Sequence, residues 1–302
     1  MNASARAGRF VWDPAAGPHG ALLPEQTTDP ASASAPLRVA DSWLVEDGRV
    51  RALPAHARRF RDTCRRLLGV PSGQVTGFLR AAVELLPSEG RWFPRVEARP
   101  GARGPCLSLW LRPAPPRGGP VVLWYPGTPD PRSLPWAKGP DLDVLGRLRE
   151  ASRASGGDEP LLLSPSGHVR EGGTTSLVWW RGATLCAPPP GPDLLPSVTR
   201  ALLTTAVAEA GHRVVPETAT PADLVGVPVW AVNALHGIRP VAGWLNLADE
   251  PPLPDSSAEA ERWQARLDRF ALPAHPGLVP DADDPAPGTA GALPAADPQY
   301  RG

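Results

Sequence analysis

The sequence is poor in lysine, methionine, tyrosine and cysteine. Of its 31 basic residues only Lys138 is a lysine, and the 302 residues include one methionine and two tyrosines. The three cysteines, Cys64, Cys106 and Cys186, are far apart and form no CxxC pattern. Such spacing favours neither a disulfide framework nor a zinc site, so we expect a reducing, cytoplasmic setting.

Long apolar runs and an excess of one charge are also lacking. No stretch of about 18 apolar residues occurs, so no transmembrane helix is expected. Residues 1–20 have no apolar core and include Asp13, which is unlike a secretory signal. The 31 basic residues are balanced by 31 acidic residues, which argues against a general binder of nucleic acid.

Several catalytic and binding motifs are absent as well. The sequence has no P-loop, no GxGxxG after a strand, no HExxH and no GxSxG. Its six histidines are scattered without the spacing of metal ligands, so no metal site is expected. Nothing in the sequence indicates a Ser-His-Asp triad.

Proline and glycine, by contrast, are abundant, with 41 and 30 residues. A chain of this length predicts two domains or one large domain at about 150 residues per domain. The composition predicts five parts: a loose N-terminal arm (1–36), a small α+β domain (37–125), a linker (126–140), a larger domain (141–272) and a disordered tail (273–302).

Hydrophobic spacing predicts the elements within these parts. Ala57, Phe60 and Cys64 recur at helical spacing, and this helix should end at Gly69. The Asp47-Gly48 pair favours a turn between strands 37–45 and 49–52. Further helices are expected near 73–86, 141–154, 197–210 and 257–270. Further strands are expected near 10–12, 92–98, 106–111, 121–125, 160–163, 175–180, 184–186, 212–216, 227–232 and 238–244.

The single lysine stands out chemically. A lysine can lose its proton and form a Schiff base, whereas an arginine stays protonated and cannot. A drift toward arginine could equally leave one lysine behind. The residues around Lys138 must therefore decide between the two interpretations.

Four other segments place polar residues at ordered points of the chain. Arg59 opens an amphipathic helix in HARRF, and Glu171 precedes an apolar strand in REGGTTS. Ser197 and Thr199 begin a helix in LPSVTR, and Asn233 stands between two strands in NALHGIRPV. Taken alone, each has a plain structural explanation as a solvated charge, a strand-edge charge, a helix cap or a turn residue.

Taken together, these segments match the needs of one cofactor. A helix N-terminus offers the amides of Val198 and Thr199 to an anion, and a nearby arginine would complete a phosphate site. A buried acid facing a pyridine nitrogen would keep that nitrogen protonated. With a lysine able to form a Schiff base, these are the four parts that pyridoxal phosphate requires.

The five segments resemble those of the class IV aminotransferases, the fold-type-IV pyridoxal phosphate enzymes. The resemblance runs from about Leu37 to Trp244, with all five segments in the family's order. It implies an α+β, two-domain fold with a small N-terminal domain and a larger, mixed-sheet, barrel-like C-terminal domain. It also implies that Lys138 and Glu171 are catalytic. The cofactor-binding residues that it implies are Arg59, Lys138, Glu171, Ser197, Val198, Thr199, Asn233 and Ala234.

The sequence departs from the family pattern at several positions. In relatives, a Gly-rich segment that contains an aromatic residue and an acid helps to shape the substrate side. That segment is absent here, and Ala40-Asp41-Ser42-Trp43 stands in its place. Ser176 stands in place of the usual asparagine and Ser197 in place of the usual glycine, which requires a negative φ. Ala234 lacks the hydroxyl that many members place on the phosphate.

The resemblance implies transfer of an amino group from an amino acid to a 2-oxo acid through a Lys138 Schiff base. An alternative is 4-amino-4-deoxychorismate lyase, which forms p-aminobenzoate and pyruvate with the same cofactor apparatus. A third is a degenerate paralogue that binds the cofactor without turnover; retention of Lys138 and Glu171 counts against it. The expected partners are a small-molecule amino acid or aminodeoxychorismate and a second copy of the chain in a homodimer, without nucleic acid or membrane.

Overall fold

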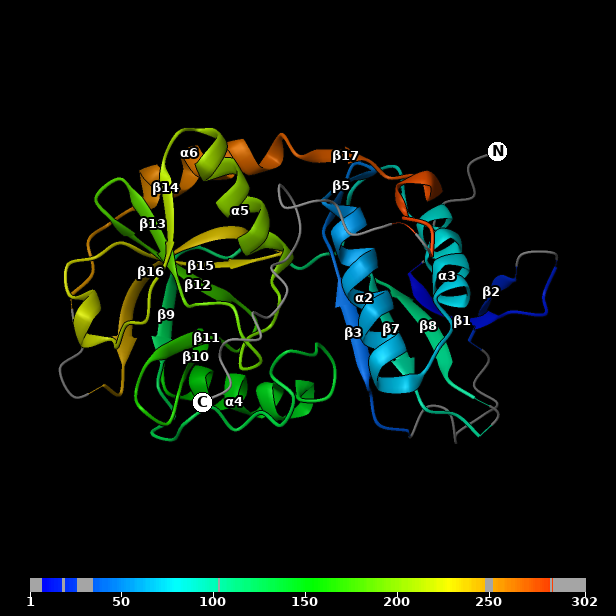
Figure 1. The fold of residues 1–302 in the computed structure, drawn as a ribbon, viewed down its shortest axis with the longest axis horizontal. Coiled ribbons are helices and arrows are strands. Elements are labelled where there is room, and N and C mark those ends of the chain that lie inside the picture. The colour runs from blue at the N-terminus through cyan, green and yellow to red at the C-terminus, as the bar shows by residue number, and fades with distance from the viewer. Residues whose placement is uncertain are drawn as a thin grey trace. The chain divides into compact units, whose positions relative to one another are not determined.

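The computed structural model describes residues 7–17, 20–25, 35–102, 104–247, 252–282 and 284. These residues form two compact units (Figure 1). The first unit takes the described residues up to Pro116, the short segment Ala137–Pro140 and the described residues from Phe270 onward. Among the described residues, the second unit consists of Arg117–Trp136 and Asp141–Arg269.

The first unit is built from two antiparallel sheets and two helices. Its larger sheet has the strand order β2-β1-β8-β7-β3, and its smaller sheet has the order β17-β5-β4-β6. The larger sheet consists of β1 (Gly8–Asp13), β2 (Ala21–Pro24), β3 (Val39–Ser42), β7 (Arg95–Arg99) and β8 (Cys106–Leu111). The smaller sheet consists of β4 (Val45–Glu46), β5 (Arg49–Arg51), β6 (Arg91–Trp92) and β17 (Ala271–Pro273). The helices are α2 (Leu53–Leu68) and α3 (Ser72–Glu84), with a short 3₁₀ helix, η2 (Pro276–Leu278), near the end of the chain.

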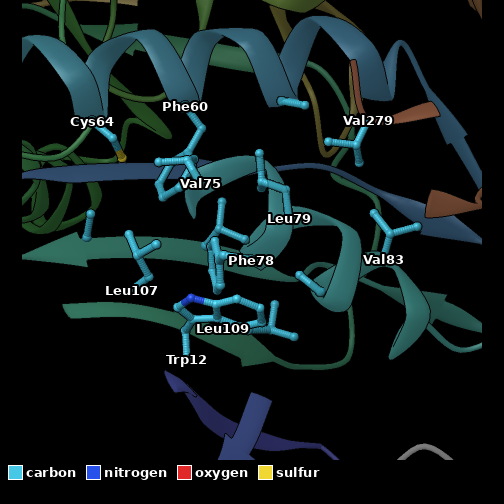
Figure 2. Close-up of a cluster of buried hydrophobic side chains, with 14 of the residues drawn as sticks. Trp12, Phe60, Cys64, Val75, Phe78, Leu79, Val83, Leu107, Leu109 and Val279 are labelled. Atoms are coloured by element: carbon cyan, nitrogen blue, oxygen red, sulfur yellow. The ribbon is translucent and has the colours of Figure 1, made fainter. Parts of the chain in front are cut away.

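The core of the first unit lies between the larger sheet and the two helices. Leu107 and Leu109 of β8 are buried in this core. Ser108 and Trp110 point to the opposite face, because side chains alternate along a strand. Phe60 of α2 and Phe78 of α3 pack with their ring centroids 6.0 Å apart (Figure 2). Helix α2 ends at Leu68 and is capped by Gly69, where the sequence predicted its end; Gly69 has the left-handed φ of 65° that glycine allows.

The second unit is a mixed sheet with three α-helices. Its strand order is β11-β10-β9-β16-β15-β12-β13-β14, and β11 also pairs with β12. The sheet therefore closes on itself from β11 round to β12 and is barrel-like. Its strands are β9 (Val121–Trp124), β10 (Glu159–Leu163), β11 (Val169–Gly172), β12 (Ser176–Arg181), β13 (Thr184–Ala187), β14 (Arg213–Pro216), β15 (Val229–Asn233) and β16 (Gly237–Leu245). Its helices are α4 (Leu142–Ala154), α5 (Val198–Glu209) and α6 (Ser257–Asp268), with the 3₁₀ helix η1 (Ala222–Leu224).

The N-terminal arm differs from the expectation of a loose segment with one short strand. Strands β1 and β2 form a hairpin, and β1 also pairs with β8 of the larger sheet. Trp12 of β1 is buried, with its ring centroid 6.1 Å from that of Phe78. The short apolar alternation of this segment did not reveal how much of it joins the sheet. The other parts of the arm, 1–6, 18–19 and 26–34, lie outside the described residues.

The expectation of a disordered tail from residue 273 is wrong for its first residues. Strand β17 pairs with β5, and Val279 is buried in the core of the first unit. Arg61 of α2 donates hydrogen bonds to the carbonyl oxygens of Pro280 (3.0 Å) and Asp281 (2.7 Å). Backbone pairing and one buried side chain order this proline-rich stretch, which composition alone could not show. Residues 283 and 285–302 lie outside the described residues.

The structure also divides the chain at other points than the sequence predicted. Strand β9, expected in the small domain, pairs in parallel with β10 and β16 of the second unit. Lys138, expected at the end of a linker, groups with the first unit. Strand β11 was not predicted, because VREG shows no apolar alternation. None of the helices among the described residues is long and apolar enough to cross a membrane.

Candidate active site

Lys138 is held against the edge of the larger sheet in the first unit. Its carbonyl oxygen accepts a hydrogen bond from the amide of Ala40 in β3, at 2.7 Å. The next residue, Gly139, has a φ of +143°. A Cβ added at Gly139 would lie 2.8 Å from the Cα of Val39. Glycine is therefore required beside the lysine, because only glycine allows this close approach of the two chain segments.

A buried cluster of Asp41, His56 and Arg59 lies on the same part of the first unit. Arg59 donates from Nε to Oδ2 and from Nη2 to Oδ1 of Asp41, both at 2.8 Å. The Nδ1 of His56 lies 2.8 Å from the same Oδ1. His56 and Arg59 are three residues apart on α2 and so face the same strand. The bidentate contact fixes the orientation of the Arg59 guanidinium.

The pKa values of this cluster follow from burial and charge. Burial alone would raise the pKa of Asp41, but the charges of Arg59 and the hydrogen bond with His56 outweigh it and hold that pKa well below its usual range. Burial lowers the pKa of His56 despite the neighbouring carboxylate. His56 is therefore neutral near pH 7 and donates its Nδ1 proton to Asp41.

Burial also lowers the pKa of Lys138, to about 8. The charge of Asp41 opposes this shift, whereas the positive charges of Arg59, Arg95 and Arg112 add to it. The chain's single lysine thus sits where its neutral, nucleophilic form is accessible near physiological pH.

In the second unit, Glu171 of β11 belongs to a buried ion network. Arg132 donates from Nη1 to Oε1 of Glu171, and it also forms a bidentate contact with Asp130 through Nε (2.9 Å) and Nη2 (2.7 Å). The amide of Leu195 donates a weaker hydrogen bond to the same Oε1, at 3.3 Å. The network therefore joins β11 to the segment that leads into α5.

Asp130 and Glu171 share the guanidinium of Arg132, and Arg170 also contacts Asp130 at 3.4 Å. Arg132 holds the pKa of Asp130 below its ordinary value, against the effect of burial. Burial raises the pKa of Glu171, and the attraction of Arg132 does not cancel that rise. Glu171 is consequently a buried acid whose charge is only partly compensated, so a cationic N–H group beside it would be stabilised.

The N-terminus of α5 offers backbone donors. Ser197 caps the helix: its Oγ accepts from the amide of Arg200 at 3.2 Å, and its φ of −77° satisfies the requirement of a negative φ for a residue in place of glycine. Among the described residues, no acceptor binds the amides of Val198 and Thr199. These two amides and the helix dipole can bind an anion.

Asn233 shapes the turn between β15 and β16. Its Oδ1 accepts hydrogen bonds from the amides of Leu235 (3.1 Å) and His236 (2.8 Å). This is an Asx turn, which closes with Gly237 at a φ of +72°. The Asn233 side chain thus positions the backbone of Ala234 and its neighbours.

The predicted site residues therefore divide between the two units. Arg59 and Lys138 lie in the first, and the other six lie in the second, where Glu171 contacts the segment before α5. Sequence reasoning missed Asp41, Arg132 and Asp130. Their contacts join positions far apart in the chain, and no local pattern marks them. Among the described residues, no group of three or more His, Cys, Asp or Glu could hold a metal ion.

The family model for amino-transferase class IV matches residues 38–244. This match covers more than half of the chain, so the protein belongs to the class IV aminotransferases, as the order of its five segments predicted. The family is dependent on pyridoxal phosphate. Among curated proteins, none matches the sequence.

Solved structures of aminotransferases share the fold. A hypothetical aminotransferase from Mycobacterium tuberculosis in its PLP-bound form gives a TM-score of 0.68 at 20% identity, covering 83% of this chain and 96% of that chain. An aminotransferase from Brucella abortus bound to the cofactor PLP gives a TM-score of 0.69 at 20% identity, covering 88% of this chain and 99% of that chain. The branched-chain aminotransferase from Thermoproteus uzoniensis with norvaline gives a TM-score of 0.72 at 18% identity, covering 89% of this chain and 99% of that chain. These similarities confirm the predicted α+β, fold-type-IV class.

Proposed function

We propose that this protein is a pyridoxal phosphate-dependent aminotransferase that moves the amino group of an amino acid to a 2-oxo acid. The observation that carries the proposal is the state of its only lysine. Lys138 is held against β3 by a glycine-dependent contact, with a pKa lowered to about 8. A group with such a pKa can act as nucleophile, acid and base near neutral pH.

The described residues fit this cofactor. The aldehyde of pyridoxal phosphate needs a nucleophilic amine. Its phosphate needs a site that binds anions, and its ring nitrogen needs an acidic side chain beside it. Lys138 provides the first, and the unengaged amides of Val198 and Thr199 provide the second. Glu171, buried and only partly compensated, provides the third. When bound, pyridoxal phosphate supplies a ring that withdraws electrons from the reacting carbon.

Each residue then has a defined task. Lys138 would hold the cofactor and would accept and return a proton at its Nζ. Glu171 would keep the ring nitrogen protonated, and Arg132 holds the Glu171 carboxylate in place. Arg59, oriented by Asp41, would offer a guanidinium to phosphate from the first unit, and the amides that begin α5 would offer an anion site in the second. Asn233 shapes the turn that presents the Ala234 backbone.

The lyase reaction on 4-amino-4-deoxychorismate uses the same residues. Both reactions need the amine of Lys138 and the acid at Glu171, so the substrate decides between them. A degenerate paralogue has no reason to keep a buried lysine with a lowered pKa, and the intact Lys138 and Glu171 argue against it.

We also propose that the enzyme is a cytoplasmic homodimer. Cys64 and Cys186 are free cysteines, as expected in a reducing compartment. The dimer is inferred from the resemblance to class IV enzymes. Sedimentation velocity at micromolar concentration measures it, and a monomer at all concentrations would contradict it.

One experiment tests the function. The purified protein is loaded with pyridoxal phosphate and given panels of D- and L-amino acids with a 2-oxo acid, and separately 4-amino-4-deoxychorismate. Formation of a new amino acid supports the aminotransferase, whereas p-aminobenzoate and pyruvate identify the lyase. Cofactor uptake without any product would indicate the degenerate paralogue. A protein that takes up no cofactor would refute all three.

A further inference from the structure

The segment that carries Lys138 leaves one unit of the protein and returns to it. Ala137–Pro140 belong to the first unit, whereas the residues on both sides, up to Trp136 and from Asp141 onward, belong to the second. Asp141 stands at the point of return, directly before helix α4. We call residues 133–141 the lysine loop. The contacts at the two ends of this loop limit how far Lys138 can move.

The carboxylate of Asp141 joins the two ends of the lysine loop. Its Oδ1 accepts hydrogen bonds from the amide (3.0 Å) and the hydroxyl (2.8 Å) of Ser133, and its Oδ2 accepts one from the amide of Leu134 (2.9 Å). Among the described residues, no backbone hydrogen bond joins Ser133 or Leu134 to Pro140 or Asp141. The contacts of one side chain therefore close the loop.

Asp141 gives up a helix cap to make these contacts. It is the N-cap residue of α4, a position where an aspartate commonly accepts hydrogen bonds from the first free amides of the helix. Its side chain makes no such contact with α4. The residue is only 6% exposed, and a buried carboxylate must be hydrogen-bonded because water no longer solvates it. Among the described residues, the hydrogen-bond partners of this carboxylate all lie in the lysine loop.

The end of the loop that Asp141 binds is itself held in place. Arg132 directly precedes the loop, and its guanidinium binds both Asp130 and Glu171. The amide of Arg132 also donates to Oδ1 of Asp130 at 3.1 Å, and the amide of Asp130 donates to the carbonyl oxygen of Leu163 in β10 at 2.9 Å. Asp141 thus ties the start of α4 to a segment that the sheet of the second unit already holds.

We propose that Asp141 is a positioning residue, which closes the lysine loop and thereby keeps Lys138 in contact with β3. This inference rests on the proposed function, which makes Lys138 the reacting amine. When the ends of a loop are joined, less conformational entropy is lost as its middle is fixed, here by the hydrogen bond from the amide of Ala40 to the carbonyl oxygen of Lys138. Without the carboxylate, Lys138 spends part of its time away from β3, where water solvates its amine.

Chemical modification of the cofactor-free protein tests this directly, because Lys138 is the only lysine. Acetic anhydride acetylates neutral amines, and mass spectrometry of the Lys138 peptide measures the rate across a range of pH, with a reference amine to correct for hydrolysis of the reagent. In the wild type, the rate should have its midpoint near the lowered pKa of about 8. In Asp141→Ala, the midpoint should rise by at least about one pH unit, toward the 10.5 of an ordinary lysine, which lowers the neutral fraction at neutral pH about tenfold or more.

Graded variants separate a positioning role from a loss of stability. Asp141→Asn keeps one carbonyl oxygen for Ser133 and should shift the midpoint less than Asp141→Ala does. Ser133→Ala loses only the hydroxyl contact and should shift it least, and this variant keeps the test available if Asp141→Ala does not fold. The matched control is Asp143→Ala, since Asp143 is exposed in the first turn of α4; it should keep the wild-type midpoint.

Two results would overturn the proposal. One is an unchanged midpoint in the folded Asp141 variants, even with a lower melting temperature, because Asp141 would then only stabilise the fold. The other is an equal shift in Asp143→Ala, because loss of any charge at the start of α4 would then explain the effect. These measurements need no pyridoxal phosphate. A protein that takes up no cofactor would therefore refute the proposed function, while the effect of Asp141 on Lys138 could still be measured.

Discussion

Lys138 shows how a single residue acquires reactivity from its surroundings. An ordinary lysine is protonated at neutral pH and is a weak nucleophile. Here burial and nearby arginines favour the neutral form, while Asp41 limits the shift. Because Asp41 is itself bound by Arg59 and His56, much of its negative charge is already compensated.

The first prediction concerns the identity of this residue. Borohydride reduction of the holoenzyme followed by peptide mapping should place the pyridoxyl label on Lys138. Lys138→Arg should lose both the label and turnover, because a guanidinium stays protonated and cannot be the nucleophile. No other lysine in the chain can take its place. A labelled or active Lys138→Arg protein, with unchanged circular dichroism, would show that the assignment is wrong.

The second prediction concerns pH. Lys138 has a lowered pKa of about 8, so its neutral fraction rises as pH rises through that value. The rate of pyridoxal phosphate uptake by the cofactor-free protein should increase roughly tenfold from pH 7 to pH 9 and then level off. Stopped-flow absorbance measures this rate.

The control for the pH profile is Arg112→Gln. Removal of a nearby positive charge makes protonation of Lys138 easier, so the profile should move to higher pH. A wild-type rate that keeps rising to pH 10, as for an ordinary lysine of pKa 10.5, would contradict the lowered pKa.

At the scale of elements, Gly139 fixes where the lysine segment meets β3. The third prediction is that Gly139→Ala displaces Lys138, since the new Cβ would lie 2.8 Å from the Cα of Val39 and 2.9 Å from the carbonyl carbon of Arg38. A displacement near 1 Å can cost on the order of 10²-fold in turnover. Cofactor uptake and kcat, measured on folded protein, report the effect.

Gly146→Ala is the matched control. Gly146 lies inside α4, and a Cβ added there meets nothing within 4 Å. Alanine in a helix interior is more favourable than glycine by about 1 kcal/mol, so this variant should be slightly more stable and fully active. Equal behaviour of the two variants would mean that the contact with β3 does not position Lys138.

Elements with a clear period were predictable from the sequence. The spacing of Ala57, Phe60 and Cys64 predicted α2 and its end at Gly69, and β8 has the predicted bounds of 106–111. Strand β11 was missed because two of its four residues are Arg170 and Glu171, so no apolar alternation marks it. Strand β17 was missed because its backbone pairing with β5, more than 200 residues earlier, leaves no local signal.

The candidate site was also predictable only in part, because a local signal in the sequence marks some of its residues and not others. Residues with a chemical signature, such as the lone lysine or the cap at Ser197, could be found without coordinates. Asp41 and Arg132 could not, because they act by contacting residues distant in sequence. Arg95, whose charge lowers the pKa of Lys138, could not be recognised either, because it lies opposite Ser42 only when β3 and β7 pair.

At the scale of the whole molecule, the first unit is assembled from three separate stretches of chain. Both of its α-helices and all of its strands except β17 come from the N-terminal part, Lys138 comes from the middle, and residues from Phe270 onward return to it after α6. The candidate reactive lysine thus depends on a unit that is complete only when the end of the chain is in place.

The fourth prediction is that this returning segment stabilises the first unit. A chain ended after Arg269 loses the β17–β5 pairing, the buried side chain of Val279 and the carbonyl oxygens that bind Arg61. Loss of one buried apolar side chain and of the partners of a buried charge should lower the free energy of unfolding by about 3–6 kcal/mol. Urea denaturation followed by tryptophan fluorescence measures this, with a chain ended after Asp284 as control, since it keeps every described residue. Equal stability of the two shortened chains would show that the segment from Phe270 onward contributes nothing to the fold.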